Sequence, residues 1–123
     1  MKTKAKNDDQ IRLVNTDTAE YEPYDFAGPA LAGISQLNLS YNRETGHGSY
    51  IVRMEPGTVT TSHVHTVREE YLVLEGDVVE AGGRLLGPGD YIIFEPGTEH
   101  CTRTINGCTI IGFDYPLPES AST

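Results

Sequence analysis

The sequence predicts an all-β protein in which antiparallel strands close into a sandwich or barrel. Short segments rich in Val, Ile, Thr and Tyr recur along the chain, and several alternate apolar with polar residues, as half-buried strands do. Turn sequences separate these segments, and their Gly or Pro residues interrupt every window in which apolar residues could recur at helical spacing. The 13 Gly and 7 Pro in 123 residues agree with many tight turns. A single domain of short strands is the resulting expectation.

The strand-like segments follow one another in chain order, and turn sequences such as "EPG" and "GPGD" lie between them. They cover residues 33–41, 49–54, 58–65, 69–76, 77–81, 89–94, 100–105 and 108–115. Two earlier segments, 10–15 and 20–26, are expected to be short edge strands, since Pro23 cannot donate to a β-ladder. The expected organisation is a disordered tail at 1–10, one domain over 11–116 and a C-terminal tail at 117–123.

The charge balance bears on the partners of the protein. Nine basic residues against eighteen acidic ones give a formal net charge of −9, which opposes binding to nucleic acid. No apolar run approaches the roughly 18–20 residues that a membrane-spanning helix needs, so no membrane partner is expected. The first ten residues, "MKTKAKNDDQ", contain no apolar stretch of the kind found in secretory signals. We expect a cytoplasmic protein that binds a small-molecule substrate or ligand.

The two cysteines are expected to be free thiols. If the Asn-Gly pair at 106–107 forms the turn of a hairpin, Cys101 and Cys108 do not lie opposite each other, so no disulfide bond is expected. Free thiols are typical of the reducing cytoplasm. Both side chains are predicted to be small buried hydrophobic groups.

Two of the four histidines lie close together in the segment "SHVHTVREE". Residues i and i+2 of a strand point to the same face, so His63 and His65 are expected to project together. A turn then brings Glu69 beside His65, which places two imidazoles and one carboxylate together, a set of ligands that holds a transition metal and leaves positions open. His100 opens a later strand and could complete a four-ligand set from the opposite wall. The alternative is that these histidines are exposed polar residues of a strand.

These residues carry a resemblance to the cupin family. The first cupin motif reads glycine, five residues, His-x-His, three or four residues, glutamate, six residues and glycine. This sequence matches it without a gap at Gly57, His63, His65, Glu69 and Gly76. The count selects Glu69 over Glu70, because only Glu69 leaves six residues before the second glycine.

The second cupin motif matches with two departures. The residues in register are Gly89, Gly97 and His100. The proline of the motif falls on Glu95, with Pro96 one position late, and the usual asparagine is replaced by Thr104. These differences affect the turn more than the metal ligands.

Most of the chain is similar to the cupin domain of ChrR-type anti-sigma factors and to small dioxygenases that cleave dihydroxyacetophenone or acetylacetone. The resemblance implies a double-stranded β-helix, the jelly-roll barrel of cupins, and one divalent transition metal held by His63, His65, Glu69 and His100. Fe(II) is the metal expected first, with zinc, nickel or manganese as alternatives. The implied activity is that of a non-haem Fe(II) dioxygenase acting on a small diketone- or hydroxyketone-like substrate. The alternatives are a non-redox isomerase, lyase or cyclase, and a non-enzymatic zinc-binding sensor or ligand-binding cupin.

One further residue and the oligomeric state complete the expectations. Tyr71 shares the inward parity of Glu69, so it is either a substrate contact or proton donor, or a core aromatic residue. A homodimer is expected, because the early segments 10–15 and 20–26 could exchange between subunits and cover exposed sheet edges.

Overall fold

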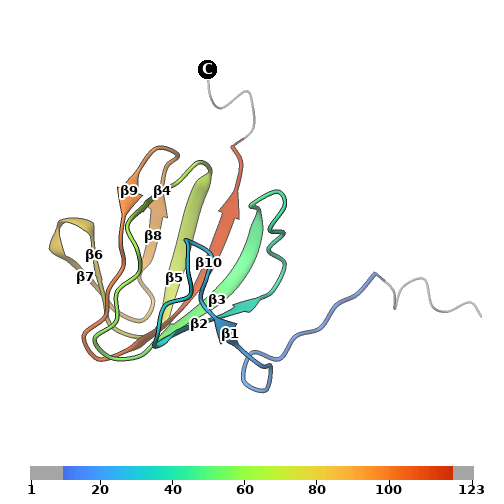
Figure 1. Cartoon of the computed structure of the whole chain (residues 1–123), viewed down its shortest axis with the longest axis horizontal. Coiled ribbons are helices and arrows are strands. Elements are labelled where there is room, and N and C mark those ends of the chain that lie inside the picture. The colour runs from blue at the N-terminus through green and yellow to red at the C-terminus, as the bar shows by residue number, and fades with distance from the viewer. Residues whose placement is uncertain (1–9, 118–123) are drawn as a thin grey trace, which may run out of the picture.

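Ten β-strands and one 3-10 turn make up the regular structure of residues 10–117, the part of the chain that the computed structural model describes (Figure 1). The elements are β1 (Glu22–Pro23), β2 (Ile34–Asn38), β3 (Gly48–Met54), β4 (His63–Val64), β5 (Arg68–Gly76), β6 (Val78–Glu80), η1 (Ala81–Gly83), β7 (Arg84–Leu86), β8 (Tyr91–Phe94), β9 (Glu99–His100) and β10 (Cys108–Tyr115). The prediction of an all-β protein is therefore confirmed for these residues. They contain no helix long and apolar enough to cross a membrane.

The strands form one large sheet and a second, more broken layer. The large sheet has the order β1-β2-β3-β10-β5-β8, and all its neighbouring strands are antiparallel. The second layer contains the pairs β4-β9 and β6-β7, and Arg103 forms bridges to both Val59 and Val79 beside them. Figure 1 shows these pairs on one side of the large sheet. Two packed layers of short antiparallel strands are the architecture of a jelly roll.

Side-chain alternation along β5 decides which residues enter the interior. Glu69, Tyr71 and Val73 are buried, whereas Glu70 and Leu72 are partly exposed on the opposite face. This period of two is the pattern that the sequence predicts for a half-buried strand. It also places Glu69, and not Glu70, in the same interior as the apolar core.

The apolar core fills one part of the space between the layers. Tyr71, Val73 and Val78 are its most completely buried large side chains. Packed with them are Tyr24, Ile34, Tyr50, Val52, Met54, Phe94, Cys108 and Ile110. Full burial of an apolar side chain of this size stabilises the fold by about 1.5–3 kcal/mol. The core thus fixes the strands from which the polar residues of the interior project.

Gly76, the last residue of the first cupin motif, has a structural role at the end of β5. Its φ is +85°, a conformation that residues with a side chain rarely adopt. A Cβ atom at this position would lie 2.0 Å from the carbonyl oxygen of Gly107. The close approach of these two backbone segments therefore requires glycine.

Several predicted elements differ from the observed ones. The predicted strands at 58–65 and 100–105 are reduced to the two-residue strands β4 and β9, although backbone hydrogen bonds such as Thr60 N–H to Thr102 O still hold the two segments side by side. The segment 10–15 is not a strand, because none of its residues pairs with a strand of the described chain. β7 was not predicted, since its three residues lie between the turn sequences "AGG" and "GPGD".

The turn at 106–107 does not join the segment 100–105 to β10 as a hairpin. β10 instead pairs with β3 and β5, where Cys108 lies opposite Met54 and Gly76. Both cysteines are free, as predicted, and Cys108 is buried. Cys101 is exposed, so the prediction of its burial was wrong: it points away from His100's side of the chain, toward solvent. The predicted tails at 1–10 and 117–123 lie almost entirely outside the described residues.

Candidate metal centre

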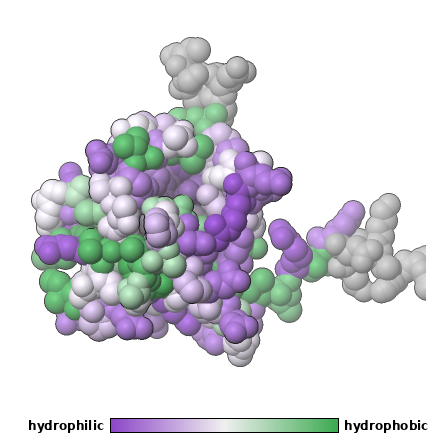
Figure 2. Space-filling model, viewed as in Figure 1, coloured by the Kyte–Doolittle hydropathy of each residue, from purple (hydrophilic) through white to green (hydrophobic). Residues whose placement is uncertain are grey.

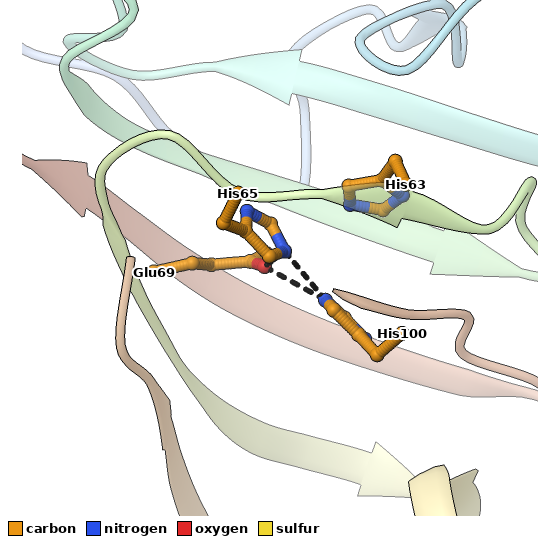
Figure 3. A group of neighbouring side chains, drawn as sticks. All are labelled: His63, His65, Glu69 and His100. Atoms are coloured by element: carbon orange, nitrogen blue, oxygen red, sulfur yellow. Dashed lines mark hydrogen bonds and ion pairs between the residues drawn. The ribbon is translucent and has the colours of Figure 1, made fainter. Parts of the chain in front are cut away.

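Three elements bring the predicted ligands together. His63 lies on β4 directly opposite His100 on β9, His65 follows β4, and the turn after it leads into β5 with Glu69. Each of these four residues offers a ligand atom, and all of these atoms lie within 4.8 Å of one another. Figure 3 shows His65 and His100 directed at the Glu69 carboxylate, with His63 beside them. The four residues that the sequence singles out as metal ligands therefore form one cluster.

The closest contacts in the cluster join three atoms. Nε2 of His65 lies 2.5 Å from Oε1 of Glu69, and Nε2 of His100 lies 3.0 Å from the same oxygen. The two Nε2 atoms are 2.6 Å apart. Nitrogen lone pairs and a carboxylate oxygen brought this close repel one another unless a positive charge lies among them. The donor set of imidazole nitrogens and a carboxylate oxygen fits a divalent transition metal.

Hydrogen bonds on the outer sides of two rings fix which nitrogen can bind a cation. Nδ1 of His63 lies 2.8 Å from the backbone oxygen of Thr61, so Nδ1–H donates and Nε2 keeps its lone pair. Nδ1 of His100 lies 3.0 Å from Oε1 of Glu80, with the same consequence for its Nε2. A carboxylate or carbonyl behind a histidine is the usual arrangement behind metal-binding imidazoles.

Glu80 is a residue of this site that the sequence did not reveal. It is buried, and its Oε2 accepts hydrogen bonds from the hydroxyls of Tyr71 at 2.6 Å and Thr102 at 2.5 Å. Together with the contact to His100, these bonds satisfy a carboxylate in the interior. The only signal in the sequence is that Glu80 follows two valines in the strand-like segment "DVVEA", and this signal does not indicate a partner.

The charges of the cluster suit a cation at its centre. Burial would raise the pKa of Glu69, but hydrogen bonds with His100 and His65 outweigh it and hold the pKa at about 2. Burial would lower the pKa of His100, but its hydrogen bonds with Glu69 and Glu80 raise it to about 9. Without a metal, a proton on His100 balances the two buried carboxylates. A metal ion can replace that proton, since metal binding and proton release are coupled.

Tyr50 and Asp114 lie on the other side of Glu69. The Tyr50 hydroxyl is 3.0 Å from Oε2 of Glu69 and 2.7 Å from Oδ1 of Asp114. Burial, together with the nearby charge of Glu69, raises the pKa of Asp114 to about 6. Because the hydroxyl has one proton for two acceptors, it donates to only one of the two carboxylates at a time. The second oxygen of Glu69 is thereby held in place.

A cavity of about 230 Å³ opens beside the cluster. Aromatic rings form one wall, where the ring centroid of Phe26 lies 4.8 Å from that of Tyr41 and 5.1 Å from that of Tyr50. The charged and titratable groups in its lining are His63, His65, Glu69 and Asp114 together with tyrosine hydroxyls, and no Lys or Arg of the described residues lines it. A larger groove of about 910 Å³ lies elsewhere on the molecule and contains none of the four clustered residues.

Tyr71 lies one layer away from the cluster. Its side chain is 0% exposed, and its hydroxyl donates to Glu80 rather than to a clustered residue. Burial and the charge of Glu80 raise its pKa far above the usual value. Its ring belongs to the core and also lines a small inner space next to His100. A direct contact of Tyr71 with substrate stays a prediction.

Comparisons with known proteins agree with this fold. A sequence model of the family described as "ChrR Cupin-like domain" matches residues 9–118. No curated protein matches the sequence at a significant level. Among solved structures, an RmlC-like cupin from Shewanella frigidimarina is 18% identical, with a TM-score of 0.70 and coverage of 90% of this chain and 96% of that one.

Two further structures are similar in fold. An acetylacetone dioxygenase from Acinetobacter johnsonii is 19% identical, with a TM-score of 0.66 and coverage of 89% of this chain and 78% of the other. A chain from the complex of Rhodobacter sphaeroides SigE with the anti-sigma ChrR is 17% identical, with a TM-score of 0.66 and coverage of 82% and 51%.

The jelly roll and the His/Glu cluster define this protein as a cupin with a candidate metal site. Because the family match covers most of the chain, the protein belongs to the ChrR cupin-like family.

Proposed function

We propose that this cupin is a metal-dependent enzyme of the non-haem Fe(II) dioxygenase type, acting on a small diketone- or hydroxyketone-like molecule. The observation that carries the proposal is the cluster of three histidines and one glutamate at the wall of an aromatic cavity. Bound there, Fe(II) would supply a Lewis acid and a site for oxygen. Zinc, nickel and manganese suit the same donors, so the metal is part of what the experiment must determine.

The residues of the chain would contribute binding and orientation. His63, His65 and His100 would present neutral nitrogens, and Glu69 would supply the single negative charge of the ligand set. Glu80 would hold the His100 ring in place, and Tyr50 would hold the second oxygen of Glu69. The ligand positions left open would face the cavity, from which the aromatic wall excludes water.

The cavity favours a neutral, flat and small substrate. Its volume of about 230 Å³ is below the roughly 300–1,000 Å³ of pockets for drug-sized ligands. A substrate carboxylate that is not bound to the metal would lie close to the carboxylates of Glu69 and Asp114, and the described lining contains no basic side chain to balance its charge. A diketone can bind through two oxygens and stack its flat skeleton on the ring of Phe26. The inner residue Tyr71 would act on substrate only if a molecule reached past His100.

A second candidate function is a zinc-binding regulatory module. The family match to the ChrR cupin-like domain, and the fold similarity to a chain of the SigE–ChrR complex, favour this alternative. Three histidines and a glutamate form a closed set of four ligands for structural zinc, which prefers tetrahedral coordination. A non-redox isomerase, lyase or cyclase would use the same metal as a Lewis acid. For either function we propose a homodimer in the cytoplasm.

Oxygen uptake tests the proposal. The protein is loaded anaerobically with Fe(II), Zn(II), Ni(II) or Mn(II) and then mixed with aerated acetylacetone, a 2-hydroxyketone, or succinate as an anionic control. We expect uptake with Fe(II) and a neutral substrate, and none with succinate. His63→Ala should abolish it, whereas His47→Ala, outside the cluster, should not. Tight zinc binding with no oxygen uptake for any compound would favour the regulatory module.

A further inference from the structure

Tyr24 is a buried tyrosine whose hydroxyl has no partner among the described residues. The other two buried tyrosines are Tyr50 and Tyr71. The hydroxyl of Tyr50 lies 3.0 and 2.7 Å from two carboxylates, and that of Tyr71 donates to Glu80 at 2.6 Å. Tyr24 is 8% exposed, yet no hydrogen bond joins its hydroxyl to another residue between positions 10 and 117. A buried tyrosine hydroxyl usually has a partner, so we looked for one in the space that it faces.

The Tyr24 hydroxyl opens onto the space beside the metal cluster. In the part of the chain that the structure describes, every fully buried polar side-chain atom has a hydrogen-bond partner, so this unpartnered oxygen touches space that a water molecule can enter. Tyr24 lines two such spaces, the cavity of about 230 Å³ and the inner space of about 20 Å³ next to His100. His63 and Glu69 line both of them as well. The hydroxyl is therefore within reach of a molecule that occupies the cavity beside the cluster.

The backbone and the ring hold Tyr24 in place. Its N–H donates to the carbonyl oxygen of Ile34 at 3.0 Å. The ring meets that of Phe26 edge to face, with centroids 5.8 Å apart. The neighbouring residues Pro23 and Asp25 are exposed, and Figure 2 shows hydrophilic residues over much of the surface in view. Alternation after β1 thus turns the Tyr24 ring inward, and its hydroxyl needs little rearrangement to meet a bound molecule.

The surroundings make this hydroxyl a hydrogen-bond donor. Burial raises the pKa of Tyr24, and the charges of Glu69 and Asp114 raise it further, so the hydroxyl keeps its proton at neutral pH. The proton of the Tyr50 hydroxyl is already used by the same two carboxylates. The described lining of the cavity contains no Lys or Arg. Of the buried hydroxyls in this lining, that of Tyr24 is therefore the one with a proton to spare for an oxygen acceptor.

We propose that the Tyr24 hydroxyl donates a hydrogen bond to an oxygen of the bound substrate and thereby selects molecules with a ketone or enolate oxygen at that place. The inference rests on the substrate class proposed above, because a diketone or hydroxyketone supplies such an oxygen. Hydrogen bonds to a charged acceptor are roughly twice as strong as those to a neutral one, so Tyr24 should favour the enolate form of the substrate. Tyr24 lies outside both cupin motifs, which explains why they do not indicate it.

Ligand binding to the zinc-loaded protein tests this contact without turnover, because zinc has no redox chemistry. Acetylacetone is titrated into the wild type, Tyr24→Phe and the control Tyr91→Phe, whose hydroxyl donates to Glu70 outside the cavity. Ultraviolet absorption follows the bound enolate. We expect the dissociation constant to rise about 10- to 100-fold in Tyr24→Phe and to stay unchanged in Tyr91→Phe. The pH at which half of the bound ligand is enolate should rise by about one unit in Tyr24→Phe.

Three controls separate a contact with the ligand from a structural role of Tyr24. Imidazole binds a metal through nitrogen and offers no oxygen, so its affinity should be the same in all three proteins. The zinc affinity and the melting temperature of Tyr24→Phe should match those of the wild type, since the lost hydroxyl has no partner in the described chain. Unchanged acetylacetone binding in Tyr24→Phe, or an equal loss for acetylacetone and imidazole, overturns the proposal. A wild type that binds neither acetylacetone nor a 2-hydroxyketone overturns it as well.

This test and the oxygen-uptake test fail independently. If Tyr24→Phe weakens acetylacetone binding to the zinc form while the Fe(II) form takes up no oxygen with any compound, the role of Tyr24 holds and the dioxygenase reaction is wrong. If the Fe(II) form takes up oxygen while Tyr24→Phe binds acetylacetone as tightly as the wild type, the reaction holds and the role of Tyr24 is wrong.

Discussion

Glu80→Gln removes the charge behind the His100 ring and keeps the shape of the side chain. In the wild type, Oε1 of Glu80 faces Nδ1 of His100 at 3.0 Å and the backbone N–H of Ala81 at 3.2 Å. Oε2 accepts from the hydroxyls of Tyr71 at 2.6 Å and Thr102 at 2.5 Å. All four partners donate to the carboxylate. An amide nitrogen at the Oε1 position would meet the donors of His100 and Ala81, and one at the Oε2 position would force both hydroxyls to turn and accept; in either orientation the negative charge behind His100 is lost.

Glu80→Gln is expected to weaken both the binding of the metal and the stability of the fold. If the amide nitrogen faces His100, the imidazole must carry its proton on Nε2 to accept at Nδ1, and Nε2 can no longer bind a metal. Removing a residue that orients a metal-bound histidine typically weakens metal binding 10- to 100-fold, or about 1.4–2.7 kcal/mol. A hydrogen bond to a charged group contributes about 1.5–3 kcal/mol to stability, so the metal-free variant should also unfold more easily.

Competition with a chromophoric chelator measures this change in metal affinity. Zn(II) is titrated in air and Fe(II) under nitrogen, for the wild type, Glu80→Gln and the control Glu44→Gln, whose side chain is exposed in a loop. Circular dichroism confirms that each variant is folded. If folded Glu80→Gln binds both metals within twofold of the wild type, Glu80 does not orient His100 and the reasoning fails.

Four further changes have defined outcomes. Gly112→Ala should cost about 1–3 kcal/mol in thermal unfolding, because the new Cβ would lie 2.5 Å from the Tyr50 ring. Phe94→Ala should cost about 3–5 kcal/mol and also weaken metal binding, because the Phe94 ring stacks on His100 with centroids 3.8 Å apart. Asp77→Asn should lower the melting temperature at pH 7 but not at low pH. Backbone N–H groups lower the folded-state pKa of this carboxyl. The stabilisation by the carboxylate is therefore present above its ordinary pKa of 3.8 and is lost as the pH falls through the lower folded-state pKa. A bound metal at 100 times its dissociation constant should add about 2.7 kcal/mol, or roughly 10 °C, and a chelator should remove this gain.

Matched variants separate these effects from general damage. Gly87→Ala should be nearly neutral, because a Cβ there meets no atom within 4 Å. Ile93→Ala removes an exposed side chain next to Phe94 and should leave metal binding intact. The assigned packing would be contradicted if Gly87→Ala lost as much stability as Gly112→Ala, or if Ile93→Ala lost as much metal affinity as Phe94→Ala. A melting temperature difference for Asp77→Asn that persists at the lowest pH at which the protein stays folded would contradict the pKa argument.

The fold could be predicted because it depends on local patterns. Alternation along β5, the turn glycines and the spacing from Gly57 to Gly76 are all visible in the sequence. The cluster of His63, His65 and Glu69 could also be predicted, since strand parity and one turn relate all three. To place His100 with them, the cupin resemblance was needed as well, because His100 lies in a segment far along the chain from Glu69.

The remaining features depend on contacts between distant segments. Glu80 meets His100 only because β6 packs beside β9 in the folded protein, and nothing near Glu80 in the sequence indicates that partner. The contact of Tyr50 with Asp114 joins strands 64 residues apart. The segment 10–15 is misread as an edge strand for a similar reason, because its apolar residues indicate burial, whereas Ile11 and Leu13 are exposed in the folded chain.

The metal content of the purified protein tests the central claim most directly. The wild type, His63→Ala, His100→Ala and the control His47→Ala are purified anaerobically without chelator, and their metals are measured by elemental analysis. We predict about one transition metal per chain in the wild type and in His47→Ala, and loss of the metal in the other two variants. A folded wild type that contains no metal and takes up none, or a metal that remains in both His63→Ala and His100→Ala, would contradict the assignment of this cluster as a metal centre.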